Sequence, residues 1–282
     1  MRLVLLTTLT MIAFASNSVL NRLAVDSGDI DPSSFALIRV LSGAIALFVI
    51  LKMRGGALQI FAPGRLAGAG SLALYMIGFS LAYKTLDAGL GALILFGTVQ
   101  VATFGWSMIK GVQLGSRVLG GATIAFIGLL VALWPDKDAA FGVWGAVCML
   151  GAGIGWAIYT MLGRSAKDPL TETASNFLIA LIPMLALLLG SDLSAQPFGI
   201  ALAVLSGAVT SGMGYALWYS LMPTLGGPRA AVIQLSAPLI AILGGVLLLG
   251  ESLTTQLVVS TALVIGGIAV AITSQSSQAG RK

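Results

Sequence analysis

Arg39 is the residue whose type and position point most directly to chemistry, because it lies inside an apolar segment that spans residues 33–52. An ionisable side chain at bilayer depth costs several kcal/mol and usually marks a functional site. The planar guanidinium group suits two parallel hydrogen bonds to a carboxylate, so Arg39 is a candidate for recognising an acidic group on a substrate. A structural arginine that bonds backbone carbonyl groups, or extends towards the lipid headgroups, fits this position equally well.

Aromatic residues form a second pattern. Tyr75, Phe79 and Tyr83 recur every four residues, which places them on one face of a helix, and Tyr215 and Tyr219 repeat that spacing later in the chain. Such rings can pack in the core, form a belt at the membrane surface or line a cavity. The belt and the cavity are equally compatible with Tyr83 and Tyr219, which lie near helix ends. Rings in the middle of a segment are expected to face a cavity, because buried phenol and indole groups need polar partners.

Uncharged amide side chains complete the candidate site. Gln100 and Gln234 lie within apolar segments, as do Asn17, Asn21 and Asn176. They are equally suited to hydrogen bonds between helices and to binding an amino or amide group. A cavity of amides, phenols and one arginine suits small zwitterions and suits inorganic ions poorly. The sequence predicts a substrate-binding cavity lined by Asn17, Arg39, Tyr75, Phe79, Gln100, Trp156, Tyr159, Tyr215, Trp218 and Gln234.

Several kinds of chemistry are excluded by what the sequence lacks. It contains no histidine and one cysteine, Cys148, so it has no imidazole ligands for a metal and no disulfide within the chain. It has no phosphate-binding loop of the nucleotide-motor type. Asp and Glu are missing from the middle of every apolar segment, which leaves Ser80 and Lys84 as the sole local pair for an intramembrane enzyme. We therefore expect no enzyme activity, no cofactor and no metal.

The elements that position these residues are membrane helices. The chain is 57% hydrophobic and 9% charged, with a mean hydropathy of +1.00, and a bilayer core needs about 20 apolar residues per helix. The net charge of +5 comes from basic residues dispersed at segment ends, which argues against a nucleic-acid partner. The sequence predicts an all-α polytopic membrane protein with ten transmembrane helices near residues 3–24, 33–52, 66–85, 89–108, 116–134, 142–163, 171–190, 198–221, 228–249 and 254–274.

Basic residues predict the orientation of these helices. With both termini in the cytoplasm, eleven Lys and Arg residues fall on the inner side and three on the outer side, which is the bias expected of a cytoplasmic face. The first segment resembles a secretory signal peptide that ends in Ala13-Phe14-Ala15. Its apolar run continues to Val25, so we interpret it as a permanent helix.

The ten helices form an internal repeat. Residues 14–24 align without gaps on residues 156–166, Tyr83 aligns with Tyr219, and the match continues through Ala92 and Ala231 to Gly111 and Gly250. Because each half has five helices, the second half enters the membrane inverted, which is typical of carriers with a site near the midplane and alternating access. The predicted units are residues 1–135 and 140–275, followed by a cytoplasmic tail over residues 276–282.

Proline and glycine indicate where these helices bend or approach each other. Pro183 and Pro238 lie inside predicted helices and should kink them. We expect both to act in gating or as hinges. The 36 glycines are interpreted mainly as close-packing positions between helices.

The chain resembles the EamA-type carriers of the drug/metabolite transporter superfamily over nearly its full length. The resemblance is carried by residues 228–239 together with Gly250-Glu251-Ser252-Leu253, and by Arg39 early in the second helix. The first half departs from the pattern, with Val99 in place of Pro238 and Val112 in place of Glu251. Its Phe96–Gln100 stretch is similar to the branch that contains bacterial amino-acid exporters, including exporters of aromatic amino acids.

This resemblance implies a carrier that exports amino acids or related small metabolites through the bacterial inner membrane. The expected partners are a small-molecule substrate and the lipid bilayer, and the expected state is a monomer or a homodimer. A broad drug or metabolite facilitator of the same fold is the first alternative. An intramembrane enzyme and a scaffold that transports nothing are more distant alternatives.

Overall fold

The computed structural model describes residues 2–111, 115–134, 143–164, 166–190, 193–225 and 227–279, and it describes the backbone alone for residues 227–229, 231 and 272–279. Throughout this part of the chain the regular elements are helices. Eight of them are long and apolar enough to cross a membrane, and two shorter apolar helices cover Ser116–Ala132 and Thr255–Ala271. The expected all-α polytopic membrane protein is thus confirmed.

Five helices make up the first half of the chain, and local sequence explains where some of them begin. The Asp31 side chain accepts hydrogen bonds from the backbone N–H groups of Ser33 and Ser34 and so caps the second helix, which has proline at its first position. Gly64 has a φ of 78° before the third helix, a conformation that favours glycine. The helices are α1 (Arg2–Asp26), α2 (Pro32–Met53), α3 (Arg65–Ala82), α4 (Ala88–Ile109) and α5 (Ser116–Ala132).

The second half also contains five apolar segments, two of which are interrupted. The predicted helix 198–221 has a π-helical segment in its middle and extends to Leu225. The predicted helix 228–249 breaks at Leu235, because Pro238 has no N–H group to donate to the carbonyl of Gln234. The elements are α6 (Val143–Gly163), α7 (Pro169–Leu187), the 3-10 turn η1 (Leu188–Gly190), α8 (Pro197–Val204), the π-helix η2 (Leu205–Met213), α9 (Gly214–Leu225), α10 (Gly227–Gln234), α11 (Ser236–Leu249) and α12 (Thr255–Ala279).

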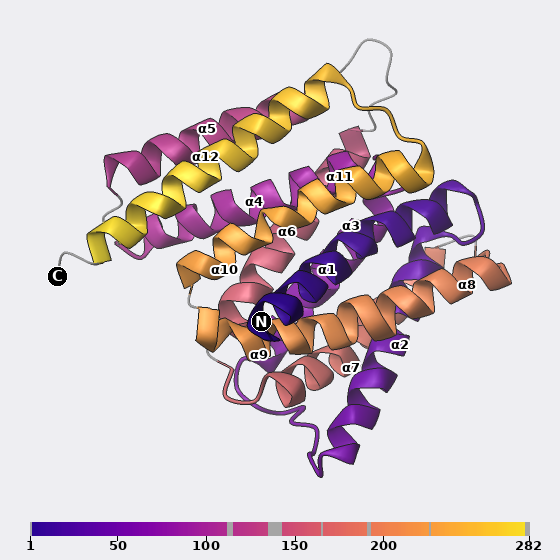
Figure 1. The fold of residues 1–282 in the computed structure, drawn as a ribbon. Helices are drawn as coiled ribbons and strands as arrows, with labels where there is room; N and C mark the ends of the chain where they lie inside the picture. The colour runs from indigo at the N-terminus through magenta and orange to yellow at the C-terminus, as the bar shows by residue number, and fades with distance from the viewer. Residues whose placement is uncertain are drawn as a thin grey trace.

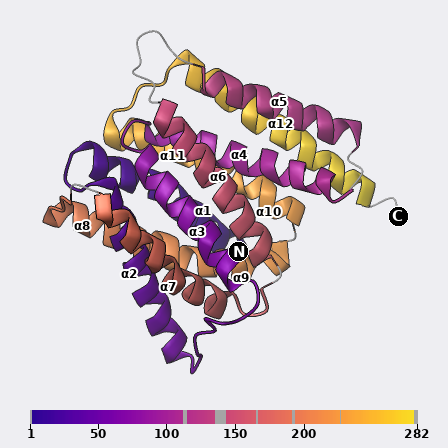
Figure 2. The ribbon, with the colours of Figure 1, turned by 180° about the vertical axis from the view of Figure 1, so that it is seen from behind.

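The helices form a bundle with α1 in its middle (Figure 1). Helix α1 packs against α11 and against the α8–η2–α9 segment, α3 packs against α6, and α2 packs against α7 and η2. Helices α5 and α12 pair along one edge, as the view from behind also shows (Figure 2). We call the end with the α2–α3 and α6–α7 connections the inner end, following the predicted orientation. The outer end carries the α1–α2, α3–α4, α7–α8 and α11–α12 connections.

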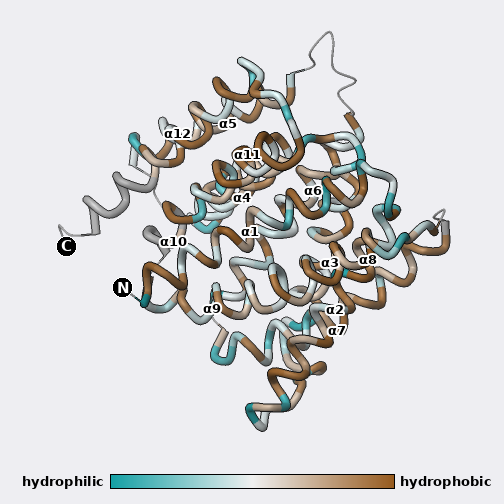
Figure 3. The backbone as a smooth tube through the Cα atoms, turned by 45° about the vertical axis from the view of Figure 1, so that its right-hand side comes forward, coloured by the Kyte–Doolittle hydropathy of each residue, from teal (hydrophilic) through white to brown (hydrophobic). Residues whose placement is uncertain are grey.

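Apolar side chains cover much of the outside of this bundle. Hydrophobic residues dominate most helices, and much of the hydrophilic chain lies at helix ends and connections (Figure 3). Large apolar side chains are exposed, as expected where lipid rather than water is the solvent. The tryptophans divide into two groups: Trp106, Trp134 and Trp144 are exposed, whereas Trp156 and Trp218 are buried.

Candidate functional site

Arg39 on α2 is fully buried within the bundle. Its Nε donates a hydrogen bond to Ser211 Oγ at 2.9 Å, and its Nη2 donates to Tyr75 Oη at 2.9 Å and to Tyr215 Oη at 3.0 Å. The two phenol oxygens are 3.0 Å apart. Its guanidinium carbon also lies 4.7 Å from the centre of the Phe79 ring, within the range of a cation–π contact. Residues from α2, α3, η2 and α9 therefore meet at one cation.

No carboxylate neutralises this cation within the described residues. All four ion pairs found there involve Arg22 or Arg65, and none includes Arg39. The Nη1 atom of Arg39 is buried and has no hydrogen-bond partner in the same part of the chain. A buried charge without a partner is costly, by several kcal/mol. The arrangement is therefore incomplete for an isolated protein and suited to a bound anion.

The π-helix η2 brings polar side chains to Asn17, next to Arg39. Ser206, Thr210 and Ser211 all donate to Asn17 Oδ1, at 2.8, 2.6 and 3.1 Å. In an α-helix, positions five apart face different directions, whereas the i to i+5 hydrogen bonding of a π-helix brings them to one face. Short π segments are frequent at functional sites. Asn17, Ser211 and Arg39 thus form one continuous hydrogen-bonded network.

Aromatic rings make up the wall around this network. Trp156 lies 5.0 Å from Tyr75 and 4.8 Å from Tyr215, measured between ring centres. Tyr159 lies 5.7 Å from Trp156, and Trp218 lies 5.7 Å from Phe14. The indole nitrogens of Trp156 and Trp218 are buried without hydrogen-bond partners among the described residues. The two indole N–H groups of this aromatic wall are therefore hydrogen-bond donors without an acceptor in this part of the chain.

The other predicted site residues have no contact with the Arg39 network among the hydrogen bonds and ring contacts of the described chain. Gln100 and Gln234 are buried in α4 and at the end of α10, and no hydrogen bond links either of them to the Arg39 network in the described chain. Pro183 lies inside α7 without interrupting it. Pro238 lies in α11, three residues after the break between α10 and α11. Eight of the predicted residues lie in or around the Arg39 network: Asn17, Arg39, Tyr75, Phe79, Trp156, Tyr159, Tyr215 and Trp218.

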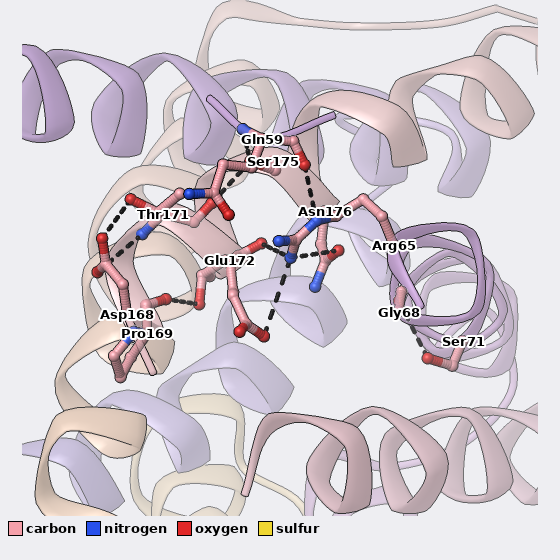
Figure 4. Close-up of polar contacts among 11 residues, drawn as sticks. Gln59, Arg65, Gly68, Ser71, Asp168, Pro169, Thr171, Glu172, Ser175 and Asn176 are labelled. Carbon is pink, nitrogen blue, oxygen red and sulfur yellow. Dashed lines mark hydrogen bonds and ion pairs between the residues drawn. The ribbon is translucent and has the colours of Figure 1, made fainter. Parts of the chain in front are cut away.

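A cavity with a volume of about 270 Å³ opens at the inner end of the bundle. It is lined by Arg65 at the start of α3, by Glu172 and Asn176 on α7, and by the rings of Tyr159 and Tyr219. Figure 4 shows Arg65 between Gln59, Glu172 and Asn176. Both tyrosines are buried within the protein, so Tyr219 does not belong to a belt at the membrane surface.

Arg65 and Glu172 are the site residues that sequence reasoning missed. Arg65 is one of the eleven basic residues that predict the orientation, and Glu172 has no role in the sequence-based prediction. Asn176 lies one helical turn after Glu172 and was already a cavity candidate. Its spacing from Glu172 was the signal that could have found the carboxylate, because positions i and i+4 share a helix face.

The outer end is tied together by a network around Arg22. Arg22 lies 3.0 Å from Asp26, 3.5 Å from Asp87 and 4.0 Å from Glu251, measured between charged atoms. Glu251 Oε1 accepts a hydrogen bond from the backbone N–H of Ala88 at 2.6 Å, and its Oε2 accepts one from Gly89 at 3.3 Å. A carboxylate at the start of α4 satisfies free N–H groups and interacts favourably with the helix dipole.

Two connections also pair at the outer end. Ile30 and Ala195 form an isolated antiparallel bridge. The Asp31 N–H donates to the Ser194 carbonyl at 2.9 Å, and the Gln196 N–H donates to the Asp29 carbonyl at 2.7 Å. The α1–α2 and α7–α8 connections, which belong to different halves of the chain, are therefore held together by backbone hydrogen bonds.

The enzyme alternative is not supported by the geometry. Ser80 is buried and accepts a hydrogen bond from Asn21 Nδ2 at 3.0 Å, whereas Lys84 is exposed. A serine nucleophile needs its base within hydrogen-bond reach. No group of three or more Cys, Asp or Glu residues that could hold a metal ion occurs within the described residues either.

Apolar helices around a buried polar network define a multi-pass membrane protein of the carrier class. The model of the EamA-like transporter family matches residues 143–273. A threonine/homoserine exporter, RhtA of Escherichia coli, is 30% identical over 69% of this chain and 66% of its own. The chain belongs to the EamA-like transporter family, within the drug/metabolite transporter superfamily, and is a transporter rather than an enzyme.

Other similar proteins cover most or all of the chain. An uncharacterized protein of Pseudomonas aeruginosa is 44% identical over 100% of this chain and 98% of its own. A probable amino-acid metabolite efflux pump of Salmonella typhimurium is 25% identical over 65% of this chain and 67% of its own. A protein of known crystal structure covers 94% of this chain with a TM-score of 0.65 and 21% identity, which shows the shared fold.

Proposed function

We propose that this transporter exports amino acids or related small metabolites across the bacterial inner membrane by alternating access, with both termini in the cytoplasm. The observation that carries this proposal is the buried guanidinium group of Arg39, which has no acidic partner within the described chain and an unpartnered Nη1. A substrate carboxylate supplies the missing negative charge. The phenols and Asn17 supply polar contacts beside it, and the rings of Phe79, Tyr75 and Trp156 supply an apolar wall.

Features of both halves support an inverted repeat. Helix α4 packs against α6, its proposed repeat partner α11 packs against α1, and α5 pairs with its own proposed partner α12. Gly111 and Gly250, which are aligned in the sequence, both have positive φ values, of 74° and 69°, after their helices. Such left-handed positions favour glycine at helix C-termini. The family match over residues 143–273 also coincides with one five-helix unit.

The proposed substrate class draws on the printed names of two relatives. One is a threonine/homoserine exporter and the other a probable amino-acid metabolite efflux pump. Both charged groups of an amino acid have complementary side chains at Arg39: the guanidinium suits the carboxylate, and the phenol and amide oxygens suit the ammonium group. The outer end is held by ion pairs and backbone hydrogen bonds, whereas a cavity opens at the inner end. This arrangement is expected of a transporter that receives its substrate from the cytoplasm.

The test is uptake of labelled threonine, methionine and phenylalanine into proteoliposomes, with and without a proton gradient. We expect saturable uptake that does not need the gradient, because the middle of the described helices carries no carboxylate to bind a proton. Arg39→Gln should lower uptake by about tenfold to a hundredfold, which is the loss of one or two charged hydrogen bonds. Lys84→Gln, at an exposed position, is the matched control for loss of a positive charge and should leave uptake unchanged.

Two results would contradict the proposal. A folded wild-type protein that moves none of the three amino acids would exclude this substrate class. If the three single variants Arg39→Gln, Tyr159→Ala and Gln100→Ala all keep wild-type uptake, the substrate cavity has been assigned to the wrong residues.

A further inference from the structure

The cavity at the inner end is lined by an ion pair with a long separation between its charged atoms. Arg65 Nη1 and Glu172 Oε2 are 3.9 Å apart, which is longer than a hydrogen bond. The Glu172 carboxylate accepts no hydrogen bond from the described residues, and its side chain is 33% exposed. The carboxylate therefore keeps its capacity to accept hydrogen bonds from a ligand that also contacts Arg65.

Arg65 is held in place without help from that carboxylate. Its Nε donates to the Gln59 carbonyl at 3.0 Å, and its Nη1 donates to the Glu172 backbone carbonyl at 3.3 Å and to Asn176 Oδ1 at 3.5 Å. Its Nη2 donates to none of the described residues. The guanidinium group is therefore positioned by neutral acceptors (Figure 4). The N–H groups of Nη2 can donate to a further partner.

The size and lining of the cavity restrict what it can bind. Its volume of about 270 Å³ is close to the lower end of the range of about 300–1,000 Å³ that is usual for small-molecule sites. One cationic and one anionic side chain face this space beside Asn176 and two tyrosine rings. A small zwitterion with its two charges close together matches this lining better than an anion or a cation alone.

The cavity adjoins the Arg39 network through stacked rings. Tyr159 lines the cavity and lies 5.7 Å from Trp156, measured between ring centres. Trp156 in turn lies 5.0 Å from Tyr75 and 4.8 Å from Tyr215, both of which accept hydrogen bonds from Arg39. Buried aromatic rings therefore separate the cavity from the Arg39 network.

We propose that the Arg65–Glu172 cavity is a second substrate site, which binds the carboxylate of a free amino acid at Arg65 and its ammonium group at Glu172. The substrate class rests on the proposed function, whereas the location and the charge pattern rest on this cavity alone. The site receives the amino acid from the inner end before it reaches Arg39. The ligand replaces the long Arg65–Glu172 contact with two shorter, charge-assisted hydrogen bonds.

Equilibrium binding to the purified full-length protein tests this second site. Labelled threonine and phenylalanine are titrated against the wild type, Arg39→Gln, Glu172→Gln and the double variant. We expect binding to persist in Arg39→Gln and to weaken about tenfold or more when Glu172→Gln is added, which is the effect of losing one charged hydrogen bond. Lys167→Gln removes a charge from an exposed position in the α6–α7 connection and should not alter the affinity.

The des-amino analogue of phenylalanine, 3-phenylpropanoate, tests the assigned chemistry. In the Arg39→Gln background, Glu172→Gln should weaken binding of phenylalanine but not of 3-phenylpropanoate, because the analogue has no ammonium group. Equal weakening of both ligands would indicate a structural effect and overturn the inference. Size-exclusion profiles and melting temperatures of the variants show whether they remain folded.

The outcomes separate this inference from the proposed function. If Arg39→Gln abolishes all binding, or if adding Glu172→Gln to Arg39→Gln leaves the affinity for both amino acids unchanged, the second site does not exist even when uptake is normal. If binding follows the expected pattern but vesicles show no uptake, the proposed transport of amino acids fails while the site stands.

Discussion

The two ends of the bundle use the same residue types in opposite ways. At the outer end, the Glu251 carboxylate is 10% exposed and accepts two backbone hydrogen bonds at the start of α4. At the inner end, the Glu172 carboxylate is 33% exposed and its one polar contact in the described chain is the 3.9 Å separation from Arg65. The arginines differ similarly, because Arg22 meets three carboxylates and Arg65 meets one.

This comparison separates a structural ion pair from one that is available to a ligand. The pairing of Arg with Glu is common to both ends, and what differs is whether each carboxylate already has its hydrogen bonds. The sequence alignment carries the same asymmetry, since Val112 occupies the position equivalent to Glu251; Val112 itself lies outside the described residues. Within the proposed repeat, the carboxylate of the second half thus corresponds to an apolar residue of the first.

A disulfide across the outer end has the largest expected effect, because it tests whether this end must open during transport. Ile30 and Ala195 face each other as a non-hydrogen-bonded antiparallel pair, for which a Cα separation of about 4.5 Å is usual and fits a disulfide. In a Cys148→Ser background, Ile30→Cys with Ala195→Cys should lose nearly all uptake on oxidation and regain it on reduction. Full uptake by the oxidised protein would mean that this end need not open.

Truncation of the two glutamates should affect stability unequally. Glu251→Ala leaves the Ala88 and Gly89 N–H groups without their acceptor and should cost about 2 kcal/mol. Glu172→Ala removes a partly exposed ion pair and a favourable helix-dipole contact, with an expected cost below about 1 kcal/mol. Thermal unfolding in one detergent compares the two variants. Equal losses would remove the distinction between the two carboxylates.

Pro238 provides a test of whether the halves differ in flexibility. Pro238→Ala restores the N–H that can bond the Gln234 carbonyl, which should allow α10 and α11 to join into one helix. We expect several-fold slower uptake with unchanged binding affinity, because a hinge affects the rate and not the site. Val99→Pro, at the equivalent position in the first half, is the reciprocal variant. Unchanged uptake and unchanged cysteine accessibility in Pro238→Ala would exclude the hinge.

The smallest expected effect is a pH dependence at the outer end. Burial raises the pKa of Glu251 above its ordinary value of 4.5, with Asp87 adding to the rise and the N–H groups of Ala88 and Gly89 and the charge of Arg22 opposing it. Because the folded-state pKa is raised, the stability contributed by Glu251 is fully present below pH 4.5 and is lost as the pH rises through the raised pKa. The melting temperature of the wild type relative to Glu251→Gln should therefore fall over this window. A relative rise with pH would contradict it.

The helical segments and the buried arginine were predictable from the sequence, for direct physical reasons. A membrane helix needs a long apolar run, and every such run is helical in the described structure, although two of the runs are interrupted. Arg39 was recognisable because a charge in such a run is rare. The spacing of Tyr75 and Phe79 on one helix face predicted that their rings would lie together, and they do.

The departures from prediction concern backbone irregularities and charges near helix ends. Nothing in the sequence of Leu205–Met213 distinguishes a π-helix from an α-helix, because its small and polar side chains are compatible with either backbone hydrogen-bond pattern. Arg22 and Arg65 were interpreted as orientation signals, since hydropathy places them at the boundaries. Their partners Glu251 and Glu172 are distant in sequence, and only the folded arrangement brings each pair together.

The division of the tryptophans gives this protein a built-in optical reporter. Trp156 and Trp218 surround the Arg39 network, while Trp106, Trp134 and Trp144 are exposed on the outside of the bundle. Replacing the three outer tryptophans by phenylalanine would leave two indoles whose emission comes from the site alone. A shift of that emission on mixing with a solute would then report occupancy in milliseconds, without a radioactive label or an attached dye.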